Sequence, residues 1–204
     1  GDSLTLHNYF FVKSLDKIRP GGILAFVTSS GTMNSKGAEA RKLMGDKADF
    51  LGATRLPGDA SKDNAATEVT TDIIFFQKRE KGAKPNHLGE FLKANERAVI
   101  GRDGQPASVL ENEYFGNNPD MVLGNLTTDK LISNKAKPRL AVVSNGNFAE
   151  QLAEAIENLP KNIYEETTLK VDEIKHAESI ATSLTNLVEG NFGFEGGKLI
   201  QMVE

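Results

Sequence analysis

The sequence predicts an α/β fold, and within it the second half of a Rossmann-like, nucleotide-binding sheet. Two observations between Leu6 and Arg79 lead to this prediction: the elements follow in the order helix, strand, helix, strand, strand, and the loops between them carry small polar residues. Gly1 stands where an initiator methionine would, and a helical pattern follows at once. We therefore expect the sequence to begin at an internal cut, with the first half of the sheet outside it.

The first helix and strand of this order have the clearest signals. Leu6–Ile18 has apolar residues along a wide helical stripe, which the turn Arg19-Pro20-Gly21-Gly22 ends. Ile23–Val27 is a continuous apolar run bounded by turn residues, which is typical of a central parallel strand covered on both faces. A ligand crevice would lie at the carboxyl end of such a strand.

Three further elements complete the predicted half-sheet. A short helix is expected over Ala38–Ala48 after a cap at Ser35, and strands over Phe50–Leu56 and Glu68–Lys78, the second rich in β-branched residues and phenylalanine. The polar loop Gly58–Thr67 between these strands contains no clear element. Loops of this length within a domain are often functional, so we expect a substrate contact there.

The rest of the chain suggests three regions. Residues 1–84 form the α/β half-domain, residues 85–138 an irregular arm packed on it, and residues 139–204 a small α+β unit. The elements expected in the last unit are a strand at 140–143, helices at 148–159 and 174–188, and a hairpin at 192–202.

Composition excludes several classes of function. The 204 residues include no cysteine and only three scattered histidines, so we expect no metal site, disulfide or thiol catalysis. The apolar runs are far too short to span a bilayer and no signal segment is present, which predicts a cytoplasmic protein without a membrane partner. Because the net charge is −4, any DNA contact must be local or supplied by other parts of the protein.

Several segments carry a resemblance to a known family. They are, in chain order, Leu6-His7-Asn8-Tyr9-Phe10-Phe11, Arg19-Pro20-Gly21-Gly22, Thr28-Ser29, Leu56-Pro57 and the run from Thr67 to Arg79. Together they resemble the carboxyl-terminal half of an amino-directed DNA adenine methyltransferase, and so a class I methyltransferase sheet. The sequences of these segments are similar to those in the large methylase-helicase proteins of bacterial plasmids, phages and conjugative elements. Asn112, Tyr114-Phe115, Pro119 and Met121–Gly124 also resemble a recurring segment of those proteins.

The resemblance implies that donor binding and catalysis are carried out by parts of the protein outside this sequence. Family members bind S-adenosylmethionine on a glycine-rich loop and hold the target amine with an Asn/Asp-Pro-Pro-aromatic motif. Neither motif is present here, and Asn118-Pro119-Asp120-Met121 lacks both the second proline and the aromatic ring. We therefore expect no catalytic residue and no bound cofactor in this chain. S-adenosylmethionine, DNA, the missing amino-terminal half and a helicase or translocase domain would belong to the parent protein.

Five polar residues are candidates for the substrate or DNA cleft. Thr28, Ser29 and Ser30 follow the predicted central strand, and Asn64 and Thr67 border the loop that would face a flipped adenine. Helix capping and turn formation are the alternative roles for such residues.

Three functional hypotheses remain open. The first is a fragment of an S-adenosylmethionine-dependent DNA adenine methyltransferase that supplies part of the sheet and of the DNA-facing cleft. The second is a non-catalytic, methylase-like scaffold or DNA-positioning module attached to a helicase or translocase. It is motivated by the acidic balance and by Ser61, which stands where related proteins carry an aromatic residue. The third is a free-standing α/β protein of unrelated activity.

Overall fold

The computed structural model describes residues 4–60, 69–86, 88–129 and 138–164, together with the backbone of a hairpin at 192–195 and 198–201. The chain divides into two compact units, Gly1–Glu165 and Glu166–Glu204. In the second unit, β8 (Phe192–Glu195) pairs antiparallel with β9 (Lys198–Gln201), which confirms the predicted hairpin. The helix predicted over 174–188 lies outside the described residues. All other elements belong to the first unit.

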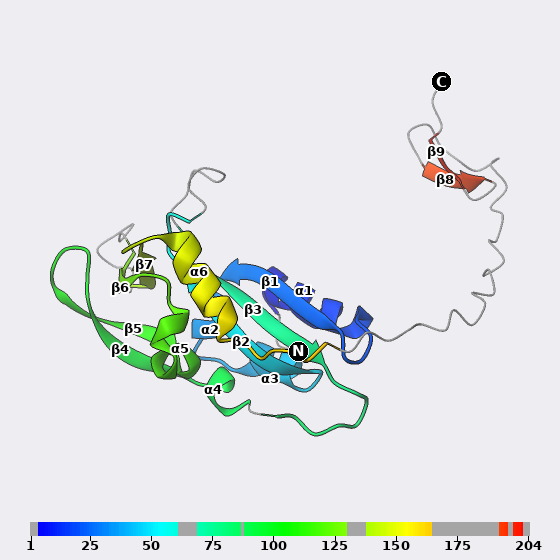
Figure 1. Ribbon diagram of the computed structural model, residues 1–204, viewed down its shortest axis with the longest axis horizontal. Helices are drawn as coiled ribbons and strands as arrows, with labels where there is room; N and C mark the ends of the chain where they lie inside the picture. The colour runs from blue at the N-terminus through cyan, green and yellow to red at the C-terminus, as the bar shows by residue number, and fades with distance from the viewer. Residues whose placement is uncertain are drawn as a thin grey trace. The chain divides into compact units, whose positions relative to one another are not determined.

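A three-stranded sheet is the centre of the first unit (Figure 1). Its strands are β1 (Ile23–Ser29), β2 (Ala48–Leu56) and β3 (Thr71–Lys78), arranged in the order β1-β3-β2. Both neighbouring pairs are antiparallel, and a β-bulge shifts the register of β2 between Phe50 and Gly52. β1 and β2 follow each other in the sequence but do not pair with each other. Instead, β3 lies between them and pairs with both.

The α/β class is confirmed, but the predicted Rossmann-like parallel sheet is not shown. β1, which we expected to be a central parallel strand covered on both faces, pairs antiparallel with β3, and its other edge pairs with no strand in the described ranges. Burial alternates along it: Leu24 and Thr28 are buried, whereas Ile23 and Val27 are exposed. A continuous apolar run does not by itself distinguish a strand with one covered face from a strand with two.

Three helices surround β1 and β2. α1 (Leu6–Lys17) follows the predicted helix closely and buries Phe11 and Leu15 against the sheet. α2 (Gly31–Asn34) follows β1 directly, and α3 (Glu39–Gly45) comes next. Ser35 ends α2 instead of beginning α3, so the predicted cap is wrong; its backbone N–H bonds to the Gly31 carbonyl and closes the α2 turn.

Arg41 of α3 holds this corner together. Its guanidinium donates to the backbone carbonyls of Thr32, Ser35 and Leu92 at 3.0, 2.8 and 3.1 Å. Burial lowers the pKa of Arg41, opposed by the charge of Glu39. Because three carbonyls from separate segments share one cation, α2 is fixed in place at the end of β1.

The segment that we expected to be an irregular arm contains regular structure. Its elements are α4 (Gly89–Leu92), β4 (Ala94–Ile100), β5 (Pro106–Asn112), α5 (Glu113–Asn117), the 3-10 helix η1 (Pro119–Met121) and β6 (Asn125–Thr128). β4 and β5 form an antiparallel hairpin. β4 includes Asn95-Glu96-Arg97, which lacks the apolar alternation typical of a strand, so its pairing with β5 was not visible in the sequence.

The last elements of the first unit agree with their predicted positions. β7 (Leu140–Val143) pairs antiparallel with β6, and α6 (Phe148–Glu157) is capped by Asn147, whose side chain accepts from the backbone N–H groups of Ala149 and Glu150. α6 crosses the sheet (Figure 1), and its Phe148 and Leu152 pack against the core. Residues 139–165 thus belong to the first unit, although we had assigned them to the same small unit as the terminal hairpin.

An aromatic cluster fills the core between the sheet, α4 and α5. Phe50 stacks on Phe91 with ring centroids 4.5 Å apart, and Phe76 meets both rings edge-on. Tyr114 also contacts Phe50 edge-on. These contacts join the hairpin region to the sheet through apolar packing. None of the helices described is long and apolar enough to cross a membrane.

Candidate functional site

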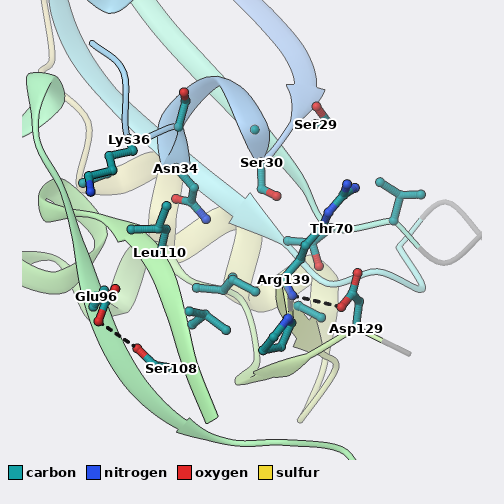
Figure 2. A pocket seen from close by; sticks show the side chains of 18 of the residues that line it. Ser29, Ser30, Asn34, Lys36, Thr70, Glu96, Ser108, Leu110, Asp129 and Arg139 are labelled. Carbon is teal, nitrogen blue, oxygen red and sulfur yellow. Dashed lines mark hydrogen bonds between the residues drawn. The ribbon is translucent and has the colours of Figure 1, made fainter. Parts of the chain in front are cut away.

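A groove with a volume of about 1290 Å³ opens beside the end of β1 (Figure 2). One wall consists of the end of β1 and α2, another of the β4–β5 hairpin, and a third of the segment around β6 and β7. Its polar and charged lining residues are Ser29, Ser30, Asn34, Ser35, Lys36, Thr70, Asn95, Glu96, Arg102, Ser108, Asp129 and Arg139. The groove therefore gathers side chains from both ends of the first unit.

The ends of β1 and β3 place hydroxyl groups at the groove. Ser29 pairs with Thr71 at the last position of the β1–β3 register, and the Ser30 N–H donates to the Thr70 carbonyl at 3.3 Å. The Thr70 hydroxyl in turn accepts from the Val142 N–H at 2.9 Å. These contacts join β1, β3 and β7 at one corner, so the serine hydroxyls lie on a firmly held part of the backbone.

Charges on the groove wall favour an anion. Lys36, Arg102 and Arg139 contribute three positive charges, against two negative charges from Glu96 and Asp129. Both carboxylates already accept hydrogen bonds, Glu96 from the Ser108 hydroxyl at 3.4 Å and Asp129 from the Arg139 backbone N–H at 3.0 Å (Figure 2). Within the described ranges, the side chains of Lys36 and Arg139 form no ion pair.

A buried ion pair lies beneath the groove. Arg55 donates to both carboxylate oxygens of Asp72, at 2.8 and 2.9 Å, and neither side chain is exposed to solvent. The Arg55 guanidinium also lies 4.0 Å from the ring centroid of Phe115 and donates to Asn34 Oδ1 at 2.9 Å. Bidentate geometry and complete burial make this the most constrained polar contact of the site.

Two further residues extend this polar network towards the hairpin. Glu111 accepts from Arg97, and its other oxygen, Oε1, lies 4.0 Å from Arg55 Nη1. The Asn112 amide donates to the carbonyls of Met33 and Phe91, both at 2.9 Å, and accepts from the Tyr114 N–H. Asn112 thereby ties α2, α4 and α5 together below the groove.

The polar part of the groove lining has the chemistry to bind an anion. Hydroxyl, amide and cationic side chains share the lining with apolar ones such as Val109, Leu110 and Leu140, and the polar groups can hold an anionic ligand through hydrogen bonds and charge. In the part of the chain that the structure describes, no group of three or more histidine, cysteine, aspartate or glutamate side chains is placed to hold a metal ion.

The structure separates the five candidates predicted from the sequence. Ser29 and Ser30 line the groove. Thr28 is buried on the opposite face of β1, where its hydroxyl lies 3.3 Å from that of Thr32, which donates to Asn8. Asn64 and Thr67 lie outside the described residues. Thr28 therefore connects β1 to α1 and does not line the groove.

Sequence reasoning did not find three of the residues that shape the groove. Asn34 and Lys36 follow β1 within the same polar segment as Ser29, but nothing in their spacing distinguishes them from ordinary turn residues. Arg139 comes from a distant part of the chain and reaches the groove only because β7 pairs with β6. No local pattern predicts such a juxtaposition.

Comparisons with known proteins give one partial match. Over 72 residues the chain is 32% identical to the Defense against restriction protein B of Escherichia phage P1. The match covers 35% of this chain and only 3% of the length of that protein. No family model and no solved structure matches the chain.

This match overturns the resemblance on which our first hypothesis rested. The relative is named for defence against restriction and not as a methyltransferase. The assignment of the chain to a DNA adenine methyltransferase is therefore wrong, and so is the predicted role as a fragment of that enzyme. With it, the expectation of S-adenosylmethionine as the cofactor of a parent protein loses its basis. Short sequence motifs of this kind can be shared because two proteins have the same function, or only because their turns and strands favour the same residues.

Proposed function

We propose that this chain is a non-catalytic DNA-binding module of a larger protein, and that the groove beside β1 holds DNA by its phosphates. The observation that carries the proposal is the charge arrangement of the groove. Its two carboxylates keep their charge but each accepts a hydrogen bond from an internal donor, whereas the exposed side chains of Lys36 and Arg139 form no ion pair in the described ranges. Such groups contact the sugar-phosphate backbone and hold a protein in position on DNA.

A local site is consistent with the acidic chain. The net charge of −4 provides no general attraction for DNA, so binding depends on a place where positive groups are concentrated. The groove has this property, with three cations against two carboxylates, and its serine hydroxyls are further donors to phosphate oxygens. Binding through a small number of phosphate contacts is weak and strongly salt-dependent.

The phage relative supports DNA as the ligand. Its name, Defense against restriction protein B, refers to a process that acts on DNA. Because the match covers 3% of that protein, its whole activity does not transfer to this chain. Attachment to a helicase or translocase domain, and a role in positioning DNA for it, stay predictions.

The sheet itself supports contact with another protein segment. In the described ranges the outer edge of β1 pairs with no strand, and apolar side chains on α1 are exposed: Leu6 by 72%, Tyr9 by 48% and Phe10 by 52%. Exposed strand edges with apolar neighbours are sites where further strands add. The predicted pairing with a part of a longer protein would occur here, and it stays a prediction.

Charge reversal in the groove tests the proposal. We expect Lys36→Glu and Arg139→Glu each to weaken binding of a fluorescein-labelled 20-mer, single-stranded or duplex, about equally across sequences, and to lower the salt slope by about one. Fluorescence anisotropy over a salt series measures both effects. Lys81→Glu makes the same charge change at an exposed turn outside the groove and is the matched control.

Two results would contradict the proposal. One is that the wild-type chain shows no salt-dependent DNA binding, and the other is that Lys81→Glu weakens binding as much as the groove variants do. Mass spectrometry of the recovered oligonucleotide checks the non-catalytic part, since a binding module leaves its mass unchanged.

A further inference from the structure

Asn34 is a nearly buried side chain at the groove wall whose hydrogen-bonding capacity is only half used. It ends α2, is 9% exposed, and lines the groove (Figure 2). Its carbonyl oxygen, Oδ1, accepts from Arg55 Nη2 at 2.9 Å and from the Asn112 backbone N–H at 3.0 Å. Oδ1 therefore has both of its lone-pair positions occupied from the protein side.

The chemistry of these partners determines which way the amide faces. A guanidinium and a backbone N–H can only donate, so the atom between them must be the oxygen. The Nδ2 amino group is consequently the other branch of the planar amide, directed away from Arg55 Nη2 and the Asn112 N–H. It donates to no acceptor in the described ranges, and it is not sealed off from solvent as the unpartnered atoms of Arg55 and Glu111 are. Because Nδ2 is reached by solvent and has no acceptor in the described ranges, an acceptor on a bound ligand can take the place of water there.

The environment of this donor indicates what kind of acceptor it meets. Lys36 follows Asn34 by two residues, and Arg139 lines the same groove together with Glu96 and Asp129, so an anionic acceptor that enters the groove finds cations on its walls. Serine hydroxyls of Ser29 and Ser30 add further donors. A non-bridging phosphodiester oxygen satisfies both the charge and the hydrogen-bond requirement.

We propose that Asn34 Nδ2 donates a hydrogen bond to a phosphodiester oxygen of the bound strand and acts as the directional contact that sets the position of the DNA in the groove. This inference rests on the proposed function. The buried Arg55–Asp72 pair has a definite part in it: it holds the guanidinium that orients the Asn34 amide. The flexible Lys36 side chain supplies attraction without direction, whereas the Asn34 donor is fixed before the ligand arrives.

The variant Asn34→Asp isolates the donor. Aspartate has the same shape and still accepts from Arg55 and Asn112, but it replaces the NH₂ group by an oxygen that repels phosphate. Ser35→Asp is the matched control, because it places the same charge on the next residue of the groove and leaves the Asn34 donor intact. We expect Asn34→Asp to weaken binding of the 20-mer about tenfold or more relative to Ser35→Asp.

An abasic strand of the same length identifies the acceptor. It retains every phosphate and lacks bases, so the loss caused by Asn34→Asp should be equal on abasic and normal strands. A loss that disappears on the abasic strand would assign the contact to a base and overturn the phosphate assignment.

Side-chain NMR provides a test that does not depend on the fold of a variant. In the ¹⁵N-labelled wild-type chain, the Asn34 NH₂ resonances should shift on addition of the abasic strand. Unchanged resonances at saturating strand would overturn the inference, as would equal affinities of Asn34→Asp and Ser35→Asp. If the groove cation variants still weaken binding in that case, the DNA-binding proposal survives and only the role of Asn34 fails.

Discussion

The two ends of one face of β3 have opposite chemistry. Asp72, Ile74 and Phe76 alternate along the strand, project to the same side, and are all completely buried. Asp72 pairs with Arg55 below the groove, whereas Phe76 lies in the aromatic cluster with Phe50 and Phe91. Asp72 and Phe76 are thus equally buried, but Asp72 makes directional hydrogen bonds whereas Phe76 makes non-directional apolar contacts.

This difference separates orientation from stability. Apolar contacts are many, weak and tolerant of small changes in shape, so an aromatic cluster stabilises the fold without requiring one geometry for each atom. A buried ion pair is costly to form and costlier to break, because removal of one partner leaves an isolated charge in the interior. We infer that the network is retained beneath the groove because it orients Asn34 and the backbone around it.

The largest expected effect is that of breaking the ion pair. Asp72→Asn preserves the size of the side chain but leaves the Arg55 guanidinium buried without its bidentate partner. We expect the free energy of unfolding to fall by about 3 to 5 kcal/mol. Urea denaturation followed by circular dichroism measures this change. A loss below about 1 kcal/mol would contradict the prediction that Arg55 depends on the Asp72 carboxylate for its burial.

A change of similar size in the aromatic cluster should cost less. Phe76→Leu keeps the position apolar and loses edge-on contacts with Phe50 and Phe91, for which we expect about 1 to 2 kcal/mol. The same denaturation experiment applies. DNA affinity should be unchanged in Phe76→Leu and reduced in Asp72→Asn, since only the latter disturbs the residue that orients Asn34. Equal loss of affinity in both variants would remove the distinction between the two regions.

The smallest effect at neutral pH, and the one that depends on pH, concerns Tyr114 at the margin of the aromatic cluster. Burial raises the pKa of its phenol above the ordinary value of 10.0, and a hydrogen bond with the Ala53 backbone opposes this in part. Because the folded state favours the protonated phenol, this stabilisation is fully present below the unfolded pKa and is lost as pH rises through the folded pKa.

The variant Tyr114→Phe removes this titration. We expect its free energy of unfolding to fall less steeply than that of the wild type above about pH 10. Unfolding curves at pH 7 and pH 11 measure the difference. Phe76→Leu removes no titratable group and should retain the wild-type pH dependence; a parallel decline in Tyr114→Phe and the wild type would contradict the assignment.

Local sequence signals predicted the elements that have strong periodicity and clear ends. The helix beginning at Leu6, the strand Leu140–Val143 and the helix beginning at Phe148 all occur where expected, because their apolar spacing and flanking turns leave little ambiguity. β4 was missed, since its charged residues depend on pairing with β5 for their conformation. Strand direction was also missed, because apolar content is the same whichever way a neighbour runs.

The sequence by itself determined the α/β class, the positions of the strongly periodic elements, and the place of Ser29 and Ser30 after a strand, because these depend on local periodicity and on the end of a strand. Only the tertiary structure decided the antiparallel order of the sheet, the burial of Thr28 and the presence of Arg139 and Lys36 on the walls of one groove. The physical reason is that hydrogen-bond partners and charges from distant segments become neighbours only when strands pair, and a linear pattern contains no record of that pairing.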